Sequence, residues 1–259
     1  MSKVAIITAA GWKGTSSAFP HVARGIPEPL LPIGDGQTIL SRHIKQLRKL
    51  GYVVFVGVGQ PGSLYPQYAS LRLREGHIDV AGTYEGTRPP GPWTLQRVEY
   101  VRKVGGIPVL IEQPASRGLY NTVKKCILAI GYVGWDEMLI TQGDYVFSNK
   151  LLRSMVELPY PAQLYMTKHT GGDMRHFVYR FDAHCAEVHA SEESFDHNAP
   201  EGVKYVYAAM REHLTQAGAP MTCVMDVLPD LVSKTKGWTD VDYPSGYARL
   251  LVWLRDGRL

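Results

Sequence analysis

The sequence predicts an α/β protein with a Rossmann-like, mixed but mostly parallel sheet flanked by helices. Apolar runs at 4–7 and 53–58 are rich in β-branched residues and do not alternate with polar ones, as expected of strands covered on both faces. A loop rich in alanine and glycine follows the first run. An amphipathic segment at 38–50, ended by Gly51, leads to the second run and predicts a helix. Open sheets built in this order bind ligands at the carboxyl ends of their strands.

Strands and helices continue to alternate along the rest of the chain. Strands are expected at 107–111, 138–141 and 163–167, with a helix after Gly118–Asn121 and another at 150–158 capped by Ser148 or Asn149. The region 60–104 is broken by glycine and proline and predicts loops around one short helix. Antiparallel pieces are expected at 177–181 and 187–190, helices at 203–214 and 223–232, a short strand at 238–242, and a helix from Pro244 to Leu254.

Composition narrows the class of protein. Hydrophobic residues make up 45% and charged residues 20% of the 259 residues, and the net charge is +4. This charge permits anionic ligands but is too small and dispersed for a nucleic-acid-binding protein. No apolar run approaches the ~18 residues of a membrane span, and no signal peptide is evident. Three widely spaced cysteines predict neither disulfides nor a zinc site. We expect one cytoplasmic domain over 1–259, with no nucleic-acid or membrane partner.

Three places in this order can support chemistry. The first is the loop after the first strand, whose backbone N–H groups can surround phosphates, although a tight turn without a ligand explains it equally well. The second is Asp144, which directly follows a core-type strand and would project from the carboxyl edge of the sheet; a helix cap or turn is the alternative. The third is the pair Asp240 and Asp242, whose carboxylates share one face of an extended segment. Carboxylates so placed suit Mg²⁺, or else form a solvated edge strand.

These motifs together resemble the nucleotidyltransferases of the GT-A-like α/β fold, the sugar-1-phosphate and phosphocholine nucleotidylyltransferase type. The family opens with a strand, Ala-Ala-Gly-x-Gly-Thr-Arg, and then Pro-Lys-Pro-Leu-Leu-Pro before a helix. Here Ala9-Ala10-Gly11, Gly14-Thr15 and Pro27-Glu28-Pro29-Leu30-Leu31-Pro32-Ile33 stand in that order. Gly143-Asp144 and Asp240-Val241-Asp242, followed by Pro244, match the two metal-binding motifs of the family. The resemblance spans the chain and is weakest at 60–104 and 168–220.

The sequence also departs from the family pattern. One residue is added inside the glycine loop, the arginine that follows Gly-Thr is Ser16, and the lysine of Pro-Lys-Pro is Glu28. Two cations that would neutralise phosphate oxygens are therefore missing. The candidates to replace them are Lys13 in the loop, Arg24 at its far end and Lys168 after a later strand.

The resemblance implies a Mg²⁺-dependent enzyme that couples a nucleoside triphosphate to a small phosphorylated acceptor and releases pyrophosphate. It implies metal ligands at Asp144, Asp240 and Asp242. Lys13, Arg24 and Lys168 are our candidates for electrostatic catalysis in place of the missing cations, and ordinary exposed cations are the alternative for each. The expected nucleotide-binding residues are Ala9, Ala10, Gly11, Gly14, Thr15, Gln113 and Gly118. A lobe at 168–220 would meet the acceptor.

Two alternatives and the assembly state stay open. A GT-A glycosyltransferase would bind a nucleotide-sugar without needing the missing cations, but usually has Asp-x-Asp after a central strand, whereas Tyr145-Val146 follows Asp144. A degenerate nucleotide-binding protein would keep the fold and the carboxylates. A homo-oligomer is compatible with the sequence.

Overall fold

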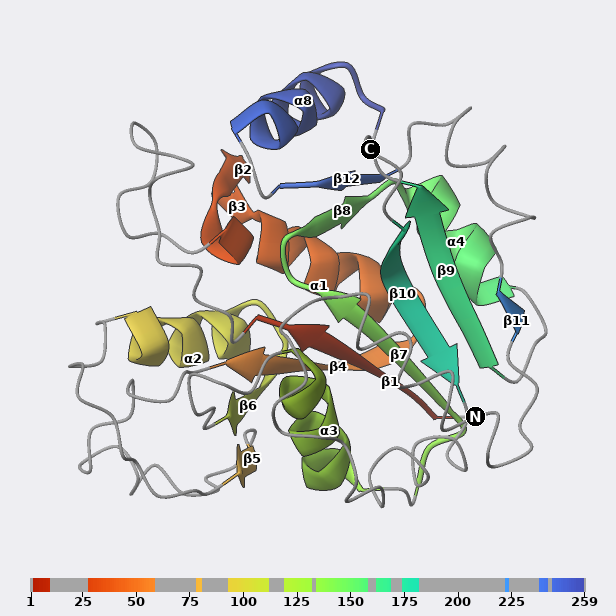
Figure 1. The fold of residues 1–259 in the computed structure, drawn as a ribbon. Helices are drawn as coiled ribbons and strands as arrows, with labels where there is room; N and C mark the ends of the chain where they lie inside the picture. The colour runs from red at the N-terminus through yellow and green to blue at the C-terminus, as the bar shows by residue number, and fades with distance from the viewer. Residues whose placement is uncertain are drawn as a thin grey trace.

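The structure is a computed structural model that describes residues 2–9, 28–58, 78–80, 93–111, 119–131, 134–157, 162–168, 174–181, 222–223, 238–241 and 244–258. Within these residues a sheet of eight strands forms the centre, in the order β11-β9-β10-β7-β1-β4-β6-β5 (Figure 1). The strands are β1 (Lys3–Thr8), β4 (Tyr52–Val58), β5 (Ile78–Val80), β6 (Ile107–Ile111), β7 (Glu137–Gln142), β9 (Ala162–Lys168), β10 (Met174–Phe181) and β11 (Thr222–Cys223).

The sheet is mixed and mostly parallel, which confirms the predicted fold class. β7, β1, β4, β6 and β5 run parallel, and only β10 is antiparallel to its neighbours β7 and β9. The parallel centre is covered on both faces, as the uniform apolar runs predicted: all residues of β1 after Lys3 are buried.

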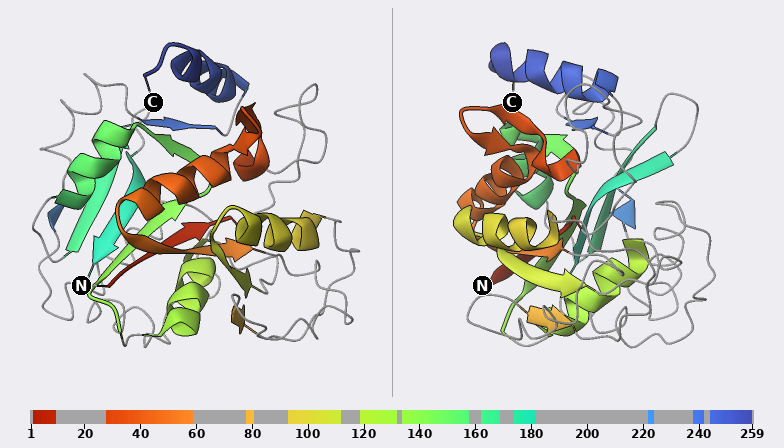
Figure 2. Two further views of the ribbon diagram at one scale, coloured as in Figure 1. Left: turned by 180° about the vertical axis from the view of Figure 1, so that it is seen from behind. Right: turned by 90° about the vertical axis from the view of Figure 1, so that its left-hand side faces the viewer.

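Helices cover the two faces of the sheet (Figure 2). One face carries α1 (Ile39–Lys49), α2 (Trp93–Lys103) and α4 (Asn149–Glu157), and α3 (Leu119–Ile130) lies on the other face. The main hydrophobic core joins the first face to the three helices: Ala5 and Ile7 of β1 and Val54, Val56 and Val58 of β4 pack with Leu40, Ile44 and Leu47 of α1, Val98 and Val101 of α2, and Leu151, Leu152 and Met155 of α4.

Local sequence signals set the limits of the helices. Thr38 caps α1 through a capping box in which its side chain accepts from the Ser41 amide at 3.1 Å. Gly51, with φ of 88°, follows α1 in the left-handed conformation that the sequence predicted for it. The Ser148 hydroxyl accepts from the Leu151 amide at 3.1 Å and so caps α4. In the described residues no helix is long and apolar enough to cross a membrane.

A smaller layer of short elements lies beside the sheet, between α1 and α8 (Pro244–Arg255) (Figure 1). It consists of the 3₁₀ helix η1 (Glu28–Leu30), the hairpin of β2 (Pro32–Gly34) and β3 (Gln37–Thr38), and the pair β8 (Tyr145–Phe147) and β12 (Trp238–Asp240). A second hydrophobic cluster holds this layer together, formed by Leu31, Ile33, Ile39, Val146, Val241, Tyr247 and Leu250.

Several sequence-based expectations are corrected by this layer and by the sheet edges. The strand predicted at 238–242 exists as β12 but pairs with β8, an element that the sequence analysis did not predict. The helix predicted from Cys223 cannot begin there, because Cys223 ends the strand β11. Strand β5 lies in a region where only loops and a helix were expected. The predicted elements at 187–190 and 203–214 lie outside the described residues.

Candidate functional site

At β1 and β7 the order in which the chain adds strands to the sheet changes direction. From β1 the chain builds outward on one side through β4 and β6, and then returns to the other side of β1 with β7. At such a point the loops that follow the two central strands diverge and leave a crevice, which is where open α/β sheets bind ligands. Thr8 is in register with Gln142 across this point. The sequence places its glycine loop after β1 and Gly143-Asp144 after β7, so both motifs begin at the switch.

Gly143 lies in close contact with the end of β1. Its amide donates to the carbonyl of Thr8 at 3.0 Å. A Cβ added at Gly143 would lie 3.1 Å from Ala9 Cβ, 3.1 Å from Pro29 Cγ and 3.2 Å from the Thr8 carbonyl oxygen. Any larger residue would push these groups apart. Glycine is therefore needed here for close approach, and this contact joins the first strand, the Pro-Leu-Leu-Pro segment and the Gly-Asp turn in one place.

The end of β1 is fixed by further hydrogen bonds. The Ala9 amide donates to the carbonyl of Gly57 at 2.9 Å, and the Thr8 hydroxyl donates to the carbonyl of Thr141 at 3.3 Å. The Ala9 N–H is thus used within the sheet, and any phosphate contact through backbone amides would come from residues after it. Nucleotide binding by Ala9 itself stays a prediction.

Asp144 and Asp240 are brought together by β8 and β12. Asp144 connects β7 to β8, is partly buried, and is engaged in an interaction of its own. Asp240 is opposite Tyr145, the residue after Asp144, in the antiparallel pair. The following residue, Val241, is fully buried in the cluster of the smaller layer. The backbones of two predicted metal ligands are therefore neighbours, although no three His, Cys, Asp or Glu side chains within the described residues form a metal-binding group.

The other predicted site residues fall at the same edge of the sheet or outside the described residues. β9 runs parallel to β7, since both are antiparallel to β10, so Lys168 ends its strand at the edge where β7 ends. β6 ends at Ile111 and α3 begins at Leu119, and the predicted residues Gln113 and Gly118 belong to the part of the chain between them that the structure does not describe. The residues outside the described part are Ala10, Gly11, Lys13, Gly14, Thr15, Arg24, Gln113, Gly118 and Asp242.

Hydrogen bonds within the smaller layer hold the segments next to the site, and the residues that make these bonds were not predicted from the sequence. The Tyr247 hydroxyl of α8 donates to the carbonyl of Pro32, which fixes the end of the Pro-Leu-Leu-Pro segment. The side-chain Nε2 of Gln46 donates to the Phe147 carbonyl and to Asn149 Oδ1, each at 2.9 Å. The sequence carries no signal for the role of the buried Gln46, because a glutamine in an amphipathic helix is usually exposed, and here α1 packs on both the main core and the smaller layer.

His43 of α1 packs under β8 without a hydrogen bond. Its ring lies 5.3 Å from the Phe147 ring, 2% of the residue is exposed, and neither ring nitrogen has a partner. Burial, and secondarily the charge of Arg42, lowers the pKa of His43 to about 3. His43 is therefore neutral at physiological pH and packs against β8 as an uncharged ring.

The fold is that of known nucleotidyltransferases. A protein from Bacillus anthracis assigned as a glucose-1-phosphate thymidylyltransferase superimposes with a TM-score of 0.58 at 13% identity, covering 98% of this chain and 96% of the other. The inositol-1-phosphate CTP transferase from T. maritima gives 0.55 at 15% identity (99% and 97%). The CTP:phosphocholine cytidylyltransferase from Streptococcus pneumoniae gives 0.51 at 12% identity (98% and 100%). No protein-family model and no curated protein matches the chain in sequence.

Proposed function

We propose that this protein is a nucleotidyltransferase that couples a nucleoside triphosphate to a small phosphorylated acceptor and releases pyrophosphate. The solved structures with this fold that were compared above act on sugar phosphates, inositol phosphate or phosphocholine. Similar folds with such low identity share an architecture, and function has to be argued from the site. The proposal therefore rests on what the site of this chain contains.

The observation that supports it best is the contact made by Gly143. The Gly-Asp turn, the end of β1 and the Pro-Leu-Leu-Pro segment are far apart in sequence, and their meeting point leaves no room for a side chain at position 143. Each motif alone has an ordinary structural explanation. Their assembly at the switch point, with Asp240 opposite the residue after Asp144, matches what triphosphate chemistry needs: backbone donors and carboxylates at one strand edge.

Carboxylate oxygens are the donors that Mg²⁺ prefers, and the donor set of Asp144, Asp240 and Asp242 fits that ion. When bound, such an ion would offset the negative charge on the triphosphate and on the departing pyrophosphate. The chain would supply the rest: the backbone that follows Ala9 would bind phosphate oxygens, and the lobe at 168–220 would position the acceptor for in-line attack.

This site lacks two positive charges that the family uses to neutralise the triphosphate. Ser16 carries no charge and Glu28 carries the wrong one for a triphosphate contact. We propose that Lys13, Arg24 and Lys168 provide the missing positive charge, because transition-state stabilisation in phosphoryl transfer is mostly electrostatic. Lys168 ends a strand at the same edge of the sheet as the Gly-Asp turn, which favours its inclusion.

The test is pyrophosphate release from each of the five common nucleoside triphosphates with Mg²⁺ and a panel of sugar 1-phosphates, inositol 1-phosphate and phosphocholine. We expect turnover with one triphosphate and one acceptor. The variant Asp144→Asn should lose about 100-fold or more in kcat, since a group that stabilises the transferring phosphate is removed. Asp256→Asn, an equal change at an exposed acid that follows α8 and pairs with Arg258, is the matched control and should retain activity.

Two outcomes would contradict the proposal. Equal turnover by Asp144→Asn and the unmodified protein would remove Asp144 from the mechanism. Transfer from a nucleotide-sugar, with no pyrophosphate released from any triphosphate, would instead identify a glycosyltransferase, the alternative that the loss of the two signature cations favours.

A further inference from the structure

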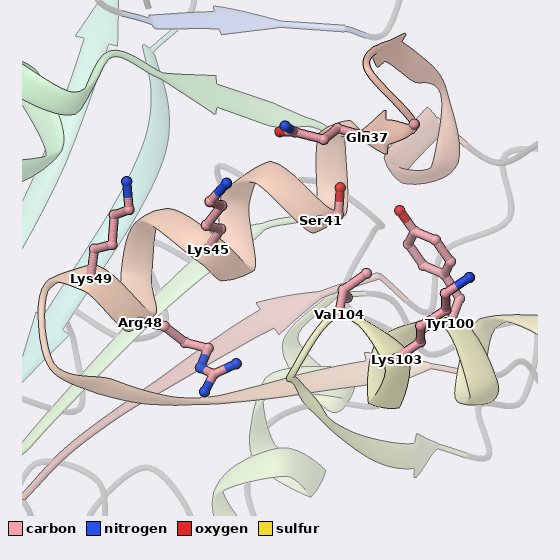
Figure 3. Close-up of a pocket in the computed structure, with 9 residues that line it drawn as sticks. Gln37, Ser41, Lys45, Arg48, Lys49, Tyr100, Lys103 and Val104 are labelled. Atoms are coloured by element: carbon pink, nitrogen blue, oxygen red, sulfur yellow. The ribbon is translucent and has the colours of Figure 1, made fainter.

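A cavity with a strong positive charge lies between α1 and α2. It has a volume of about 520 Å³ and is lined by Lys45, Arg48 and Lys49 of α1 and by Lys103 of α2. Figure 3 shows the three cationic side chains of α1 arrayed along that helix, with the α2 residues beside them. Among its lining residues there is no Asp or Glu. A volume of this size suits a small organic ligand rather than a single ion.

Helical spacing places the three cations of α1 around the same cavity. Lys45, Arg48 and Lys49 stand at positions i, i+3 and i+4 of α1, so they start from one face of the helix, and Figure 3 shows Lys45 and Lys49 extending in one direction and Arg48 in another. All three are exposed, and α1 contains no acidic residue that would neutralise them. Within the described part of the chain, neither they nor Lys103 make an ion pair. Four like charges around one cavity repel one another, and a bound anion would relieve that repulsion.

Part of this charge has a structural explanation. Arg48 and Lys49 end α1, and Lys103 ends α2, where cations stabilise the negative end of the helix dipole. That effect acts on each helix separately and does not require the two ends to face one cavity. It also leaves out Lys45, which is a full turn before the end of α1. The shared cavity therefore needs a further explanation.

The polar end of the cavity is held in place. The Tyr100 hydroxyl of α2 hydrogen-bonds to Oγ1 of Thr38 at 2.9 Å, which ties α2 to the start of α1. Tyr100 and Gln37 both line the cavity and can contact a ring or a hydroxyl-bearing group of a ligand. Arg48 lies over the backbone of Gly105, where an added Cβ would be 1.9 Å from one guanidinium nitrogen. The guanidinium can take this place because position 105 has no side chain.

The cationic end of this cavity lies away from the site at the strand ends, whereas its other end reaches Gln37 and the first turn of α1. α1 is followed at once by β4, and α2 by β6, so the last turns of both helices lie at the amino ends of those strands. The switch point with Gly143 lies at the carboxyl ends. The cationic end of the cavity is therefore at the opposite edge of the sheet from the predicted triphosphate site.

We propose that the cavity between α1 and α2 is a second binding site, for a small organic molecule that carries two or more adjacent phosphate groups. The phosphates bind to Lys45, Arg48, Lys49 and Lys103, and the remainder of the molecule lies against Tyr100 and Gln37. Lysine and arginine at this density favour multiply charged phosphate over a single carboxylate. The proposal does not depend on the activity at the strand ends.

The test uses inorganic tripolyphosphate as the probe, titrated into the full-length protein in a calorimeter without divalent cations. The double variant Lys45→Gln/Lys49→Gln should weaken one class of sites tenfold or more. Lys150→Gln/Arg153→Gln, an equal loss of charge at exposed positions of α4, is the matched control and should bind as the unmodified protein does. Arg48→Gln is an independent variant and should weaken the same class of sites.

Distinct results separate this proposal from the nucleotidyltransferase and from a nucleic-acid-binding surface. Binding that Asp144→Asn leaves intact and Lys45→Gln/Lys49→Gln removes would support the cavity even if no pyrophosphate release is found. Equal tripolyphosphate binding by the Lys45→Gln/Lys49→Gln variant and the α4 control would overturn the proposal. The proposal would also be overturned if Lys45→Gln/Lys49→Gln lost binding to a long single-stranded RNA but still bound tripolyphosphate. The cations would then form a surface for a macromolecule.

Discussion

Replacing His43 with leucine should change how the stability of this protein depends on pH. The imidazole is buried under β8, contacts the Phe147 ring and has no hydrogen-bond partner for either nitrogen. At neutral pH the neutral ring leaves one donor and one acceptor unpaired, which costs about 1–3 kcal/mol per buried group. Leucine removes both polar atoms at similar volume, so His43→Leu should be at least as stable as the unmodified protein at pH 7.

The pH effect has a definite sign. The pKa of His43 is lowered from 6.5 in the unfolded chain to about 3 in the folded one, chiefly by burial. A depressed pKa means that the neutral form is stabilised by folding, so this contribution is fully present above pH 6.5 and is lost as the pH falls towards 3. At 1.36 kcal/mol per unit of pKa, the loss is about 2 kcal/mol by pH 5 and about 3 kcal/mol by pH 4. Arg42, whose positive charge also lowers the pKa of His43, contributes a smaller share.

The assay is urea denaturation of both proteins at pH 7, 6 and 5, followed by circular dichroism. Carboxylates that titrate over this range affect both proteins alike, so the difference between the two curves isolates His43. The free energy of unfolding should fall by about 2 kcal/mol more in the unmodified protein than in His43→Leu between pH 7 and pH 5. Parallel curves would refute the reasoning and show that the buried ring is not held neutral. Arg42→Met should reduce the dependence in part.

Three further substitutions test other contacts. Gly143→Ala should lower kcat at least tenfold while costing about 1–3 kcal/mol of stability, because the new methyl group would press on Pro29; a variant with unchanged turnover in the pyrophosphate assay would contradict this. Glu137→Gln should destabilise the fold by about 2–4 kcal/mol in urea denaturation, since it leaves the buried Arg180 without the carboxylate 3.4 Å away, and a loss below 0.5 kcal/mol would be against it. Ser148→Ala should cost about 1 kcal/mol through loss of the α4 cap, measured as a lower thermal midpoint with kcat unchanged.

The central strands could be predicted from the sequence because their surroundings are uniform. β1 and β7 are buried on both faces, so their apolar runs depend little on which neighbours they have. The helix α1 could be predicted equally well, since its cap, its amphipathic pattern and Gly51 all indicate the same helix. Because these strands were predicted, the site could be placed at their carboxyl ends. The hydrogen bond from Gly143 to Thr8 shows that two of the predicted motifs meet at this edge of the sheet.

The smaller layer could not be predicted, because its elements are short and depend on distant partners. β8 has three residues, and its pairing with β12 depends on residues nearly a hundred positions later. The hairpin of β2 and β3 did carry a local signal, Gly34-Asp35-Gly36, and all three residues adopt positive φ. This signal does not identify a hairpin by itself, because the flanking strands have only three and two residues and show no clear alternation of apolar and polar residues.

The cluster of the smaller layer has a consequence for how the chain folds during synthesis. Leu31 and Ile33 are covered by Val241, Tyr247 and Leu250, which follow them by about 200 positions and therefore leave the ribosome long after them. Contacts between such distant residues form late and slowly. The main core can assemble once β10 has emerged, because Val178 is its last member along the described chain, but the Pro-Leu-Leu-Pro segment stays uncovered until α8 has been synthesised. Synthesis of α8 is therefore the step that covers this segment, and a chain that stops before α8 would expose it to aggregation.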